Sequence, residues 1–228
     1  KRSSADITEL SVKINKIVND YLEVPQRVAE DMKHYGKRFD ISKINFELLG
    51  REFAKAKHKH LMLKDLEELV SQSIAAMLIT NPGRINFYER YRQIIREYNE
   101  EQNRVTIERT FDELMKLTQE LGEEEKRYIK EGFENDEQLA VYDLLFVKDL
   151  SKSDIKKLKE VSVELLAKIR ETIVELDHPF DKPETSAMID ILIRDILWRS
   201  LPESYPEKSI HAYRQTVFEY VYNQYNIA

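Results

Sequence analysis

The sequence predicts an all-α protein, an irregular multi-helix bundle of about 9–11 helices with little or no sheet. Two observations lead to this fold class. Only five glycines and six prolines punctuate the 228 residues, and the period-two alternation of apolar and polar residues that is typical of strands is almost absent. Apolar residues recur instead at spacings of three and four, which places them on one face of a helix.

The first 80 residues are expected to form four helices, each with its apolar residues on one side. They cover residues 7–22, 25–36, 42–57 and 63–80. Ser42 is placed to cap the third helix, whose apolar side is expected to include Leu48. The fourth helix ends at Asn81-Pro82-Gly83, because proline lacks the amide donor and glycine adopts backbone angles that other residues avoid.

The helix expected at 85–101 contains an unusual number of aromatic residues. Its apolar face would carry Phe87 or Tyr88, Tyr91, Ile94 or Ile95, and Tyr98. Aromatic stripes at helical period mostly bury area against another helix, so the tyrosines are assigned to the core and the arginines of this stretch to the surface. These arginines are Arg84, Arg90, Arg92 and Arg96. Their alternation with tyrosines allows a second interpretation, which is stacking on single-stranded bases.

The rest of the chain is also expected to be helical. Helices are predicted at 106–121, from 123, at 136–146, at 151–176, around 188–197 and around 210–221. Gly122 would end the first of them, Ser151 would cap the fourth, and Met188 is among the apolar residues that indicate the fifth. Residues 177–183 form a loop with two prolines. We expect three domains, which are N-terminal helices at 1–80, a central domain at 81–176 and C-terminal helices at 177–228.

Composition and charge narrow the function classes. No cysteine occurs, which excludes disulfides, thiolate nucleophiles and cysteine metal sites and fits a cytoplasmic protein. No apolar run approaches the roughly 18 residues of a membrane helix, so no membrane partner is expected. The net charge is −6, but residues 1–100 hold 18 Lys/Arg against 15 Asp/Glu, whereas residues 101–228 hold 18 against 27. The first half would therefore meet a polyanion more readily.

Basic residues gather before and within the fourth helix. With Arg84, they are the candidate contacts to a DNA backbone: Arg51, Lys55, Lys57, Lys59, Lys64 and Arg84. Lysines of this kind neutralise phosphates without reading sequence. A solvated helix face is the competing interpretation, and it is the favoured one.

The sequence contains no motif for catalysis. The five glycines are isolated, so no phosphate-binding loop is present, and a Gly-x-Ser-x-Gly turn is also missing. Glu175 and His178 form a single Glu-x-x-His, whereas a helical two-metal site needs two such pairs. His58 and His60 would diverge by about 200° on a helix. We therefore expect no catalytic, cofactor or metal residue, with a hydrolase using Glu175 and His178 as a minor alternative.

Three runs in order carry a resemblance to a known family. They are Asn81–Asn99, Glu108–Leu114, and Glu137–Leu145 with its Glu-x-x-Ala-x-Tyr-Asp pattern. Together with the final helices around Tyr205-Pro206, they resemble the helical C-terminal region of the R subunit of type I restriction enzymes. The resemblance covers roughly residues 45–225, and residues 1–44 look like the link from a preceding part of that subunit.

The resemblance implies a noncatalytic assembly module. In this family the R subunit carries a nuclease domain, two ATP-hydrolysing motor domains that pull duplex DNA, and a helical portion associated with docking on the methyltransferase and specificity subunits. The chain is therefore expected to be a fragment whose parent is an ATP-dependent type I deoxyribonuclease. ATP and Mg²⁺ would belong to the missing domains, and DNA would be reached through the complex. The alternative is a stand-alone helical nucleic-acid-binding module.

Overall fold

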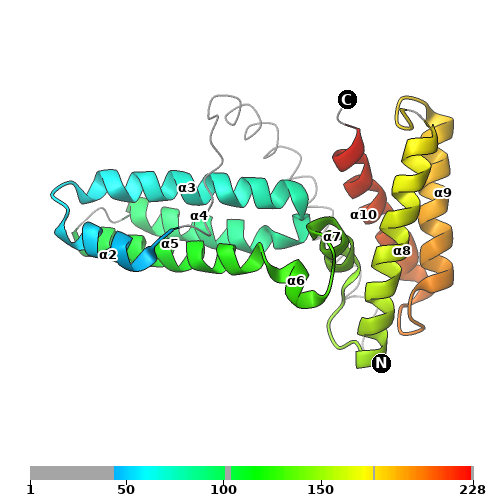
Figure 1. Ribbon diagram of the computed structural model, residues 1–228, viewed down its shortest axis with the longest axis horizontal. Coiled ribbons are helices and arrows are strands. Elements are labelled where there is room, and N and C mark those ends of the chain that lie inside the picture. The colour runs from blue at the N-terminus through cyan, green and yellow to red at the C-terminus, as the bar shows by residue number, and fades with distance from the viewer. Residues whose placement is uncertain (1–43, 101–103, 177, 227–228) are drawn as a thin grey trace. The chain divides into compact units, whose positions relative to one another are not determined.

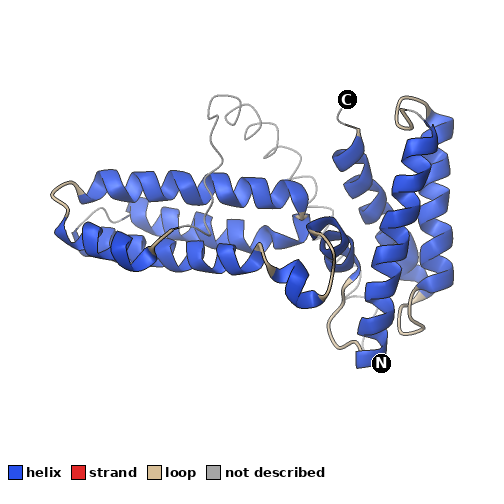
Figure 2. Cartoon of the chain, viewed as in Figure 1, coloured by secondary structure: helices blue, strands red, loops and turns tan. Residues whose placement is uncertain are grey.

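The structure, a computed structural model, describes residues 44–100, 104–176 and 178–226. Within these ranges the chain forms nine α-helices and one short 3-10 helix and contains no strand (Figure 1, Figure 2). The prediction of an all-α bundle is confirmed. The helices expected at 7–22 and 25–36 and the cap at Ser42 lie outside the described residues. None of the described helices combines the length and the apolar composition that crossing a membrane requires.

The described residues divide into two compact units. Unit 1 contains residues 80–83 and 128–226, and unit 2 contains residues 44–79 and 84–127. Both units therefore combine separate stretches of sequence and do not follow the expected ranges 1–80, 81–176 and 177–228. The reason is that the helices on both sides of Gly83 share one core in unit 2, whereas Thr80 and Asn81 bond to helices that come much later in the chain.

Unit 2 is built from four helices. They are α2 (Phe46–Lys55), α3 (Lys59–Thr80), α4 (Ile85–Glu100) and α5 (Arg104–Glu124). The cap of α2 is Asn45, whose Oδ1 accepts a hydrogen bond from the amide of Leu48 at 3.0 Å. The expected stop between α3 and α4 is only four residues long and includes the 3-10 helix Pro82–Arg84. Gly122 does not end a helix, because α5 continues to Glu124.

The core of unit 2 confirms the helical periodicity. Val70, Ile74, Phe111, Leu114, Leu117 and Leu121 are all at most 1 % exposed. The rings of Phe53 and Phe111 stack with centroids 3.5 Å apart and an angle of 3° between their planes. Phe87 is buried, and Tyr88, Tyr91 and Tyr98 pack against this core, as the aromatic stripe predicts. Leu48 is the exception, since it is 54 % exposed.

Unit 1 contains one short and four long helices. They are α6 (Arg127–Glu131), α7 (Asp136–Leu145), α8 (Lys152–Leu176), α9 (Pro183–Ser200) and α10 (Glu207–Tyr225). Asn135 caps α7 by accepting from the amide of Gln138 at 3.0 Å, and Ser151 caps α8 by accepting from the amide of Asp154 at 3.1 Å. The prediction at Ser151 is thus confirmed. These caps bind amide groups that a helix start leaves without partners.

Two buried tyrosines tie the core of unit 1 to backbone carbonyls. The Tyr205 hydroxyl donates to the carbonyl of Leu145 at 2.7 Å, and the Tyr220 hydroxyl donates to the carbonyl of Thr80 at 3.2 Å. Both residues are at most 6 % exposed. Each ring therefore fills the core while its polar end is satisfied.

Alkaline pH is expected to destabilise unit 1 through these tyrosines. Burial raises the pKa of Tyr205 and of Tyr220 above the ordinary 10.0, so the folded state binds these protons more tightly than the unfolded state. Their contribution to stability is complete below pH 10 and falls above it, by up to about 1.4 kcal/mol per pH unit and group. Tyr220→Phe should lower this slope, as measured by denaturant unfolding at neutral and alkaline pH. An unchanged slope would contradict the assignment.

Candidate functional site

Three of the six candidate DNA contacts are already bound to carboxylates within unit 2. Arg51 forms an ion pair with Glu47, one turn earlier on α2. The Lys59 Nζ lies 2.6 Å from Glu108 Oε1 and 5.2 Å from the centroid of the Phe53 ring. These contacts use the charge of Lys59 to hold α3 against α5, and they leave its side chain only 19 % exposed.

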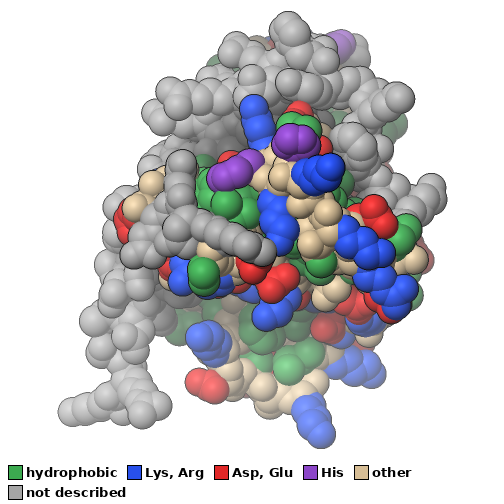
Figure 3. All heavy atoms as spheres, turned by 90° about the vertical axis from the view of Figure 1, so that its left-hand side faces the viewer, with side chains coloured by type: hydrophobic (Ala, Val, Ile, Leu, Met, Phe, Trp, Pro, Cys, Tyr) green, Lys and Arg blue, Asp and Glu red, His purple; other side chains and the backbone are tan. Residues whose placement is uncertain are grey.

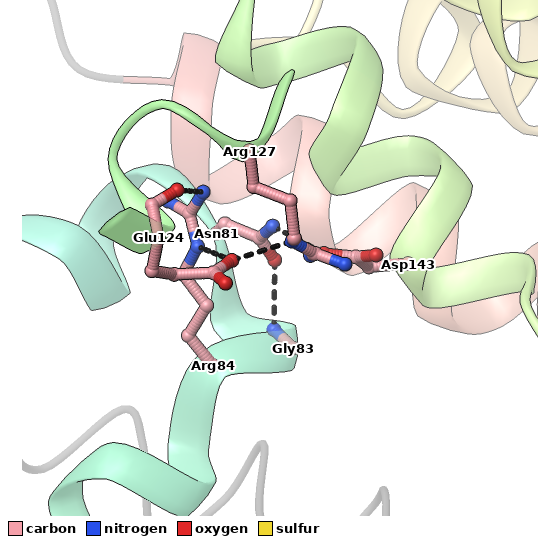
Figure 4. Close-up of polar contacts among 6 residues, drawn as sticks. All are labelled: Asn81, Gly83, Arg84, Glu124, Arg127 and Asp143. Carbon is pink, nitrogen blue, oxygen red and sulfur yellow. Dashed lines mark hydrogen bonds and ion pairs between the residues drawn. The ribbon is translucent and has the colours of Figure 1, made fainter. Parts of the chain in front are cut away.

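Arg84 is the third, and it is buried. Its side chain is 3 % exposed. Its Nε donates to Glu124 Oε1 at 2.9 Å, and its Nη2 donates to the Glu124 carbonyl at 3.3 Å (Figure 4). Arg127 Nε donates to the same carboxylate oxygen at 2.7 Å. The expectation that Arg84 lies on the surface is wrong, since its guanidinium satisfies the end of α5 inside unit 2 and cannot reach a phosphate.

The arginines and tyrosines of α4 have separate environments. Arg90 pairs with Glu120 of α5, and this partner raises the pKa of Arg90 and lowers the pKa of Glu120. The Tyr91 hydroxyl donates to Glu67 at 3.5 Å, and burial raises the pKa of Tyr91 to about 12. The Tyr98 hydroxyl lies 3.0 Å from His60 Nδ1. Tyr91 and Tyr98 thus pack against α3, which argues against stacking on bases.

Seven Lys and Arg side chains of unit 2 are exposed and have no ion pair to a described residue. They are Lys55, Lys57, Lys64, Arg92, Arg96, Lys116 and Lys126. Figure 3 views unit 2 from the end where α2 meets the start of α3, and it shows Lys, Arg and His side chains with acidic side chains among them. The surface is therefore a mixed one, in which the unpaired cations are the groups able to bind an anion.

A small polar cluster in unit 1 explains the Asn-Pro-Gly run. Asn81 is fully buried; its Nδ2 donates to Asp143 Oδ2 at 2.7 Å, and its Oδ1 accepts from the Gly83 amide at 3.0 Å (Figure 4). A Cβ atom on Gly83 would lie 3.1 Å from both Asn81 Oδ1 and Asp143 Cβ. Close packing therefore favours glycine here, and the cluster has a structural role.

The most unusual surface of unit 1 is an apolar stripe on α9. Trp198 is 61 % exposed, Met188 52 % and Ile191 46 %. Their spacings of three and seven residues place them on one side of the helix, opposite the buried Ile189 and Ile193. Met188, one of the apolar residues that indicate this helix in the sequence, is exposed because α9 turns its neighbour Ile189 inward. We name these three residues the α9 stripe.

Charged residues within and beside the α9 stripe neutralise one another. Arg194 pairs with Asp195 at 2.8 Å, and Arg199 pairs with Glu164 of α8 at 2.7 Å. The stripe was missed in the sequence because α9 is apolar on more than one side, so periodicity alone does not separate core from surface. One indication was present in the sequence, which is Trp198, the single tryptophan of the chain.

Residues with catalytic or metal-binding potential do not converge in the described part of the chain. Glu175 and His178 are both exposed. No group of three or more His, Asp or Glu side chains that could hold a metal ion lies within the described ranges. His58 and His60 lie on either side of the first residue of α3, and His60 contacts Tyr98. The hydrolase alternative therefore gains no support from the geometry.

Comparison with known protein families gave one match. The family described as "Type I restriction enzyme HindI endonuclease subunit-like, C-terminal" matches residues 1–226. Comparisons with curated proteins and with solved structures gave no match. The family match covers nearly the whole chain and agrees with the resemblance carried by the runs at 81–99, 108–114 and 137–145. The chain belongs to the type I restriction enzyme HindI endonuclease subunit-like, C-terminal family.

Proposed function

We propose that this region is an assembly module, which docks the DNA-translocating nuclease subunit of a type I restriction enzyme onto the methyltransferase and specificity subunits. The observation that carries the proposal is the α9 stripe in a member of this family. Under this proposal the nuclease, ATP and Mg²⁺ chemistry belongs to other parts of the same subunit, and the complex works in the cytoplasm. The region itself supplies a surface.

The residue types of the α9 stripe are those that dominate protein interfaces. Tryptophan and methionine are enriched in interface cores, and tryptophan is a frequent hot spot, because a large ring gains much from leaving water. Exposed side chains of this size are costly on a free surface. Met188, Ile191 and Trp198 lie on one side of α9, with Asp195 between Ile191 and Trp198, at the helical spacings that helix-in-groove recognition uses.

Charge favours a protein partner for the α9 stripe over a nucleic acid. The neighbouring arginines Arg194 and Arg199 are occupied by Asp195 and Glu164. Residues 128–226 also hold 13 Lys/Arg against 19 Asp/Glu, so unit 1 repels phosphates overall. Apolar side chains among charges that neutralise one another fit docking that is driven by burial and depends little on salt.

The test is the affinity of the 228-residue chain for the purified methyltransferase–specificity complex of the same restriction system. Trp198→Ser is expected to weaken binding about thirtyfold, since loss of an interface tryptophan costs about 2 kcal/mol or more. The matched control is Val174→Ser on α8, which changes another exposed apolar residue, 83 % exposed, and should leave affinity unchanged.

Three outcomes would decide the matter. Binding that Trp198→Ser weakens and Val174→Ser does not would support docking through the α9 stripe. Tight binding that neither variant changes would move the docking surface elsewhere. No binding of the unchanged chain, together with tight and salt-dependent binding to duplex DNA, would favour the alternative of a stand-alone nucleic-acid-binding module.

A further inference from the structure

We propose that unit 2 has a weak, sequence-independent binding site for duplex DNA, which contacts the phosphodiester backbone through two rows of cations. One row is Lys57 and Lys64, immediately before and within α3, and the other is Arg92 and Arg96 on α4. This site goes beyond the proposed docking function and uses a different unit. It would hold DNA near the assembled complex without selecting a sequence.

The cations of unit 2 are of two kinds, those paired with carboxylates and those left unpaired. In unit 2, Lys59, Arg84 and Arg90 each bind a carboxylate of α5, namely Glu108, Glu124 and Glu120. Their positive charges are neutralised by these carboxylates, and the ion pairs help to pack the helices of unit 2. By contrast, the four cations of the proposed rows are exposed, and no ion pair to a described residue holds them. Only unpaired cations gain by displacing the counterions of DNA.

Lys64 on α3 and the pair Arg92 and Arg96 on α4 lie on neighbouring helices. Contacts from His60 to Tyr98 and from Glu67 to Tyr91 show that α3 and α4 run antiparallel, because the later residue of one meets the earlier residue of the other. Axes of packed helices are about 8–10 Å apart. Long lysine and arginine side chains on two such helices can reach phosphates on both sides of a groove about 12 Å wide.

Arg92 and Arg96 lie along one side of α4, because they are four residues apart on that helix. Lys64 lies on α3, and Lys57 lies in the bend two residues before α3 begins at Lys59. On α4 the side of Arg92 and Arg96 is not the one used by Tyr91 and Tyr98. Arg92 also lies over the Tyr88 ring at 5.8 Å, which orients its guanidinium without neutralising it.

The same geometry explains why binding at this site would be weak and independent of sequence. Tyr91 and Tyr98 are engaged with α3, so bases have no aromatic platform, and lysines contact phosphates without base specificity. Asp65, Glu68 and Glu89 lie on α3 and α4 near these rows in sequence and reduce the local positive potential. Weak, purely electrostatic binding to duplex DNA follows.

The test measures binding of the 228-residue chain to a duplex of arbitrary sequence over a series of salt concentrations. Four phosphate contacts predict a slope of about −3 to −4 in log K against log salt. Changing Lys57, Lys64, Arg92 and Arg96 together to Gln should weaken binding at least tenfold at low salt and bring the slope close to zero. The matched control changes Lys148, Lys152, Lys157 and Lys208, which are exposed in unit 1, and removes the same total charge.

The outcomes separate the site from a general charge effect. Contacts to the DNA backbone are supported if only the unit 2 variant loses DNA binding. They are supported further if a variant in which Arg92 and Arg96 are changed to Lys, and not to Gln, binds DNA as the unchanged chain does. Equal loss in the control variant, no measurable binding of the unchanged chain at low salt, or a marked preference for single-stranded DNA would overturn the proposal. Circular dichroism checks folding of both variants. Their affinity for the methyltransferase–specificity complex should stay unchanged, so failure here leaves the docking proposal intact.

Discussion

Replacing Arg84 with alanine is expected to lower the free energy of unfolding by about 3 kcal/mol, because it leaves a largely buried carboxylate short of its main partner. Arg84 is 3 % exposed and Glu124 is 14 % exposed. The substitution removes two hydrogen bonds, to the carboxylate and to the carbonyl of Glu124. Arg127 still donates a hydrogen bond to the Glu124 carboxylate, which limits the loss of stability. Denaturant unfolding followed by circular dichroism measures the change.

Two controls separate charge from burial. Arg90→Ala breaks another arginine–glutamate pair of α4 and α5, but Arg90 and Glu120 are 46 % and 48 % exposed, so a loss below about 1 kcal/mol is expected. Changing Arg84 to Met and Glu124 to Leu together should recover most of the stability, because neither charge is then left buried alone. If Arg84→Ala and Arg90→Ala lowered the free energy of unfolding equally, the buried pair would contribute no more to stability than the exposed one.

Phe111→Ala should be at least as damaging, with a loss of about 3–5 kcal/mol. Phe111 is 0 % exposed, and its ring stacks on Phe53. Alanine would leave a cavity in the centre of unit 2 that four helices line, and a rigid helical core relaxes only partly around such a cavity. The measurement is again equilibrium unfolding in denaturant.

The matched control lies on the same helix. Val105 is 76 % exposed on α5, so Val105→Ala should change stability by less than about 0.5 kcal/mol. Phe111→Leu, which keeps most of the apolar volume, should lie between the two variants. A small effect of Phe111→Ala would mean that the Phe53–Phe111 stack is not central to the unit.

Local pattern was enough to predict most of the fold. The period of Phe87, Tyr91 and Tyr98 predicted which side of α4 is buried, since helical geometry fixes that side once the helix forms. Ser151 before an acidic first turn predicted a cap for the same local reason. At Gly122 this reasoning failed, because packing of Leu121 and its neighbours in the core holds α5 helical through a residue of poor propensity.

Partners distant in sequence account for what the sequence did not predict. Arg84 meets Glu124, and Lys59 meets Glu108, across 40 and 49 residues, and nothing near either cation marks it as paired. The candidate DNA contacts therefore included two residues whose charges are used by distant partners inside unit 2, besides Arg51, whose partner Glu47 lies four residues away. The α9 stripe was missed for the related reason that an apolar helix does not reveal which of its sides another helix covers.

In the described chain, unit 2 surrounds the short stretch 80–83 of unit 1 and ends before the rest of unit 1 begins, and this arrangement sets the order of folding during synthesis. The described residues of unit 2 end at 127, so α2 to α5 leave the ribosome and can pack before α7 exists. Unit 1 folds later, because Asn81 forms its hydrogen bond with Asp143, 62 residues later, and Thr80 accepts a hydrogen bond from Tyr220, 140 residues later. An early-folded unit 2 shortens the free loop that these contacts must close and so lowers its entropic cost. The two units are thus expected to fold in sequence, with α10 as the helix that completes the second.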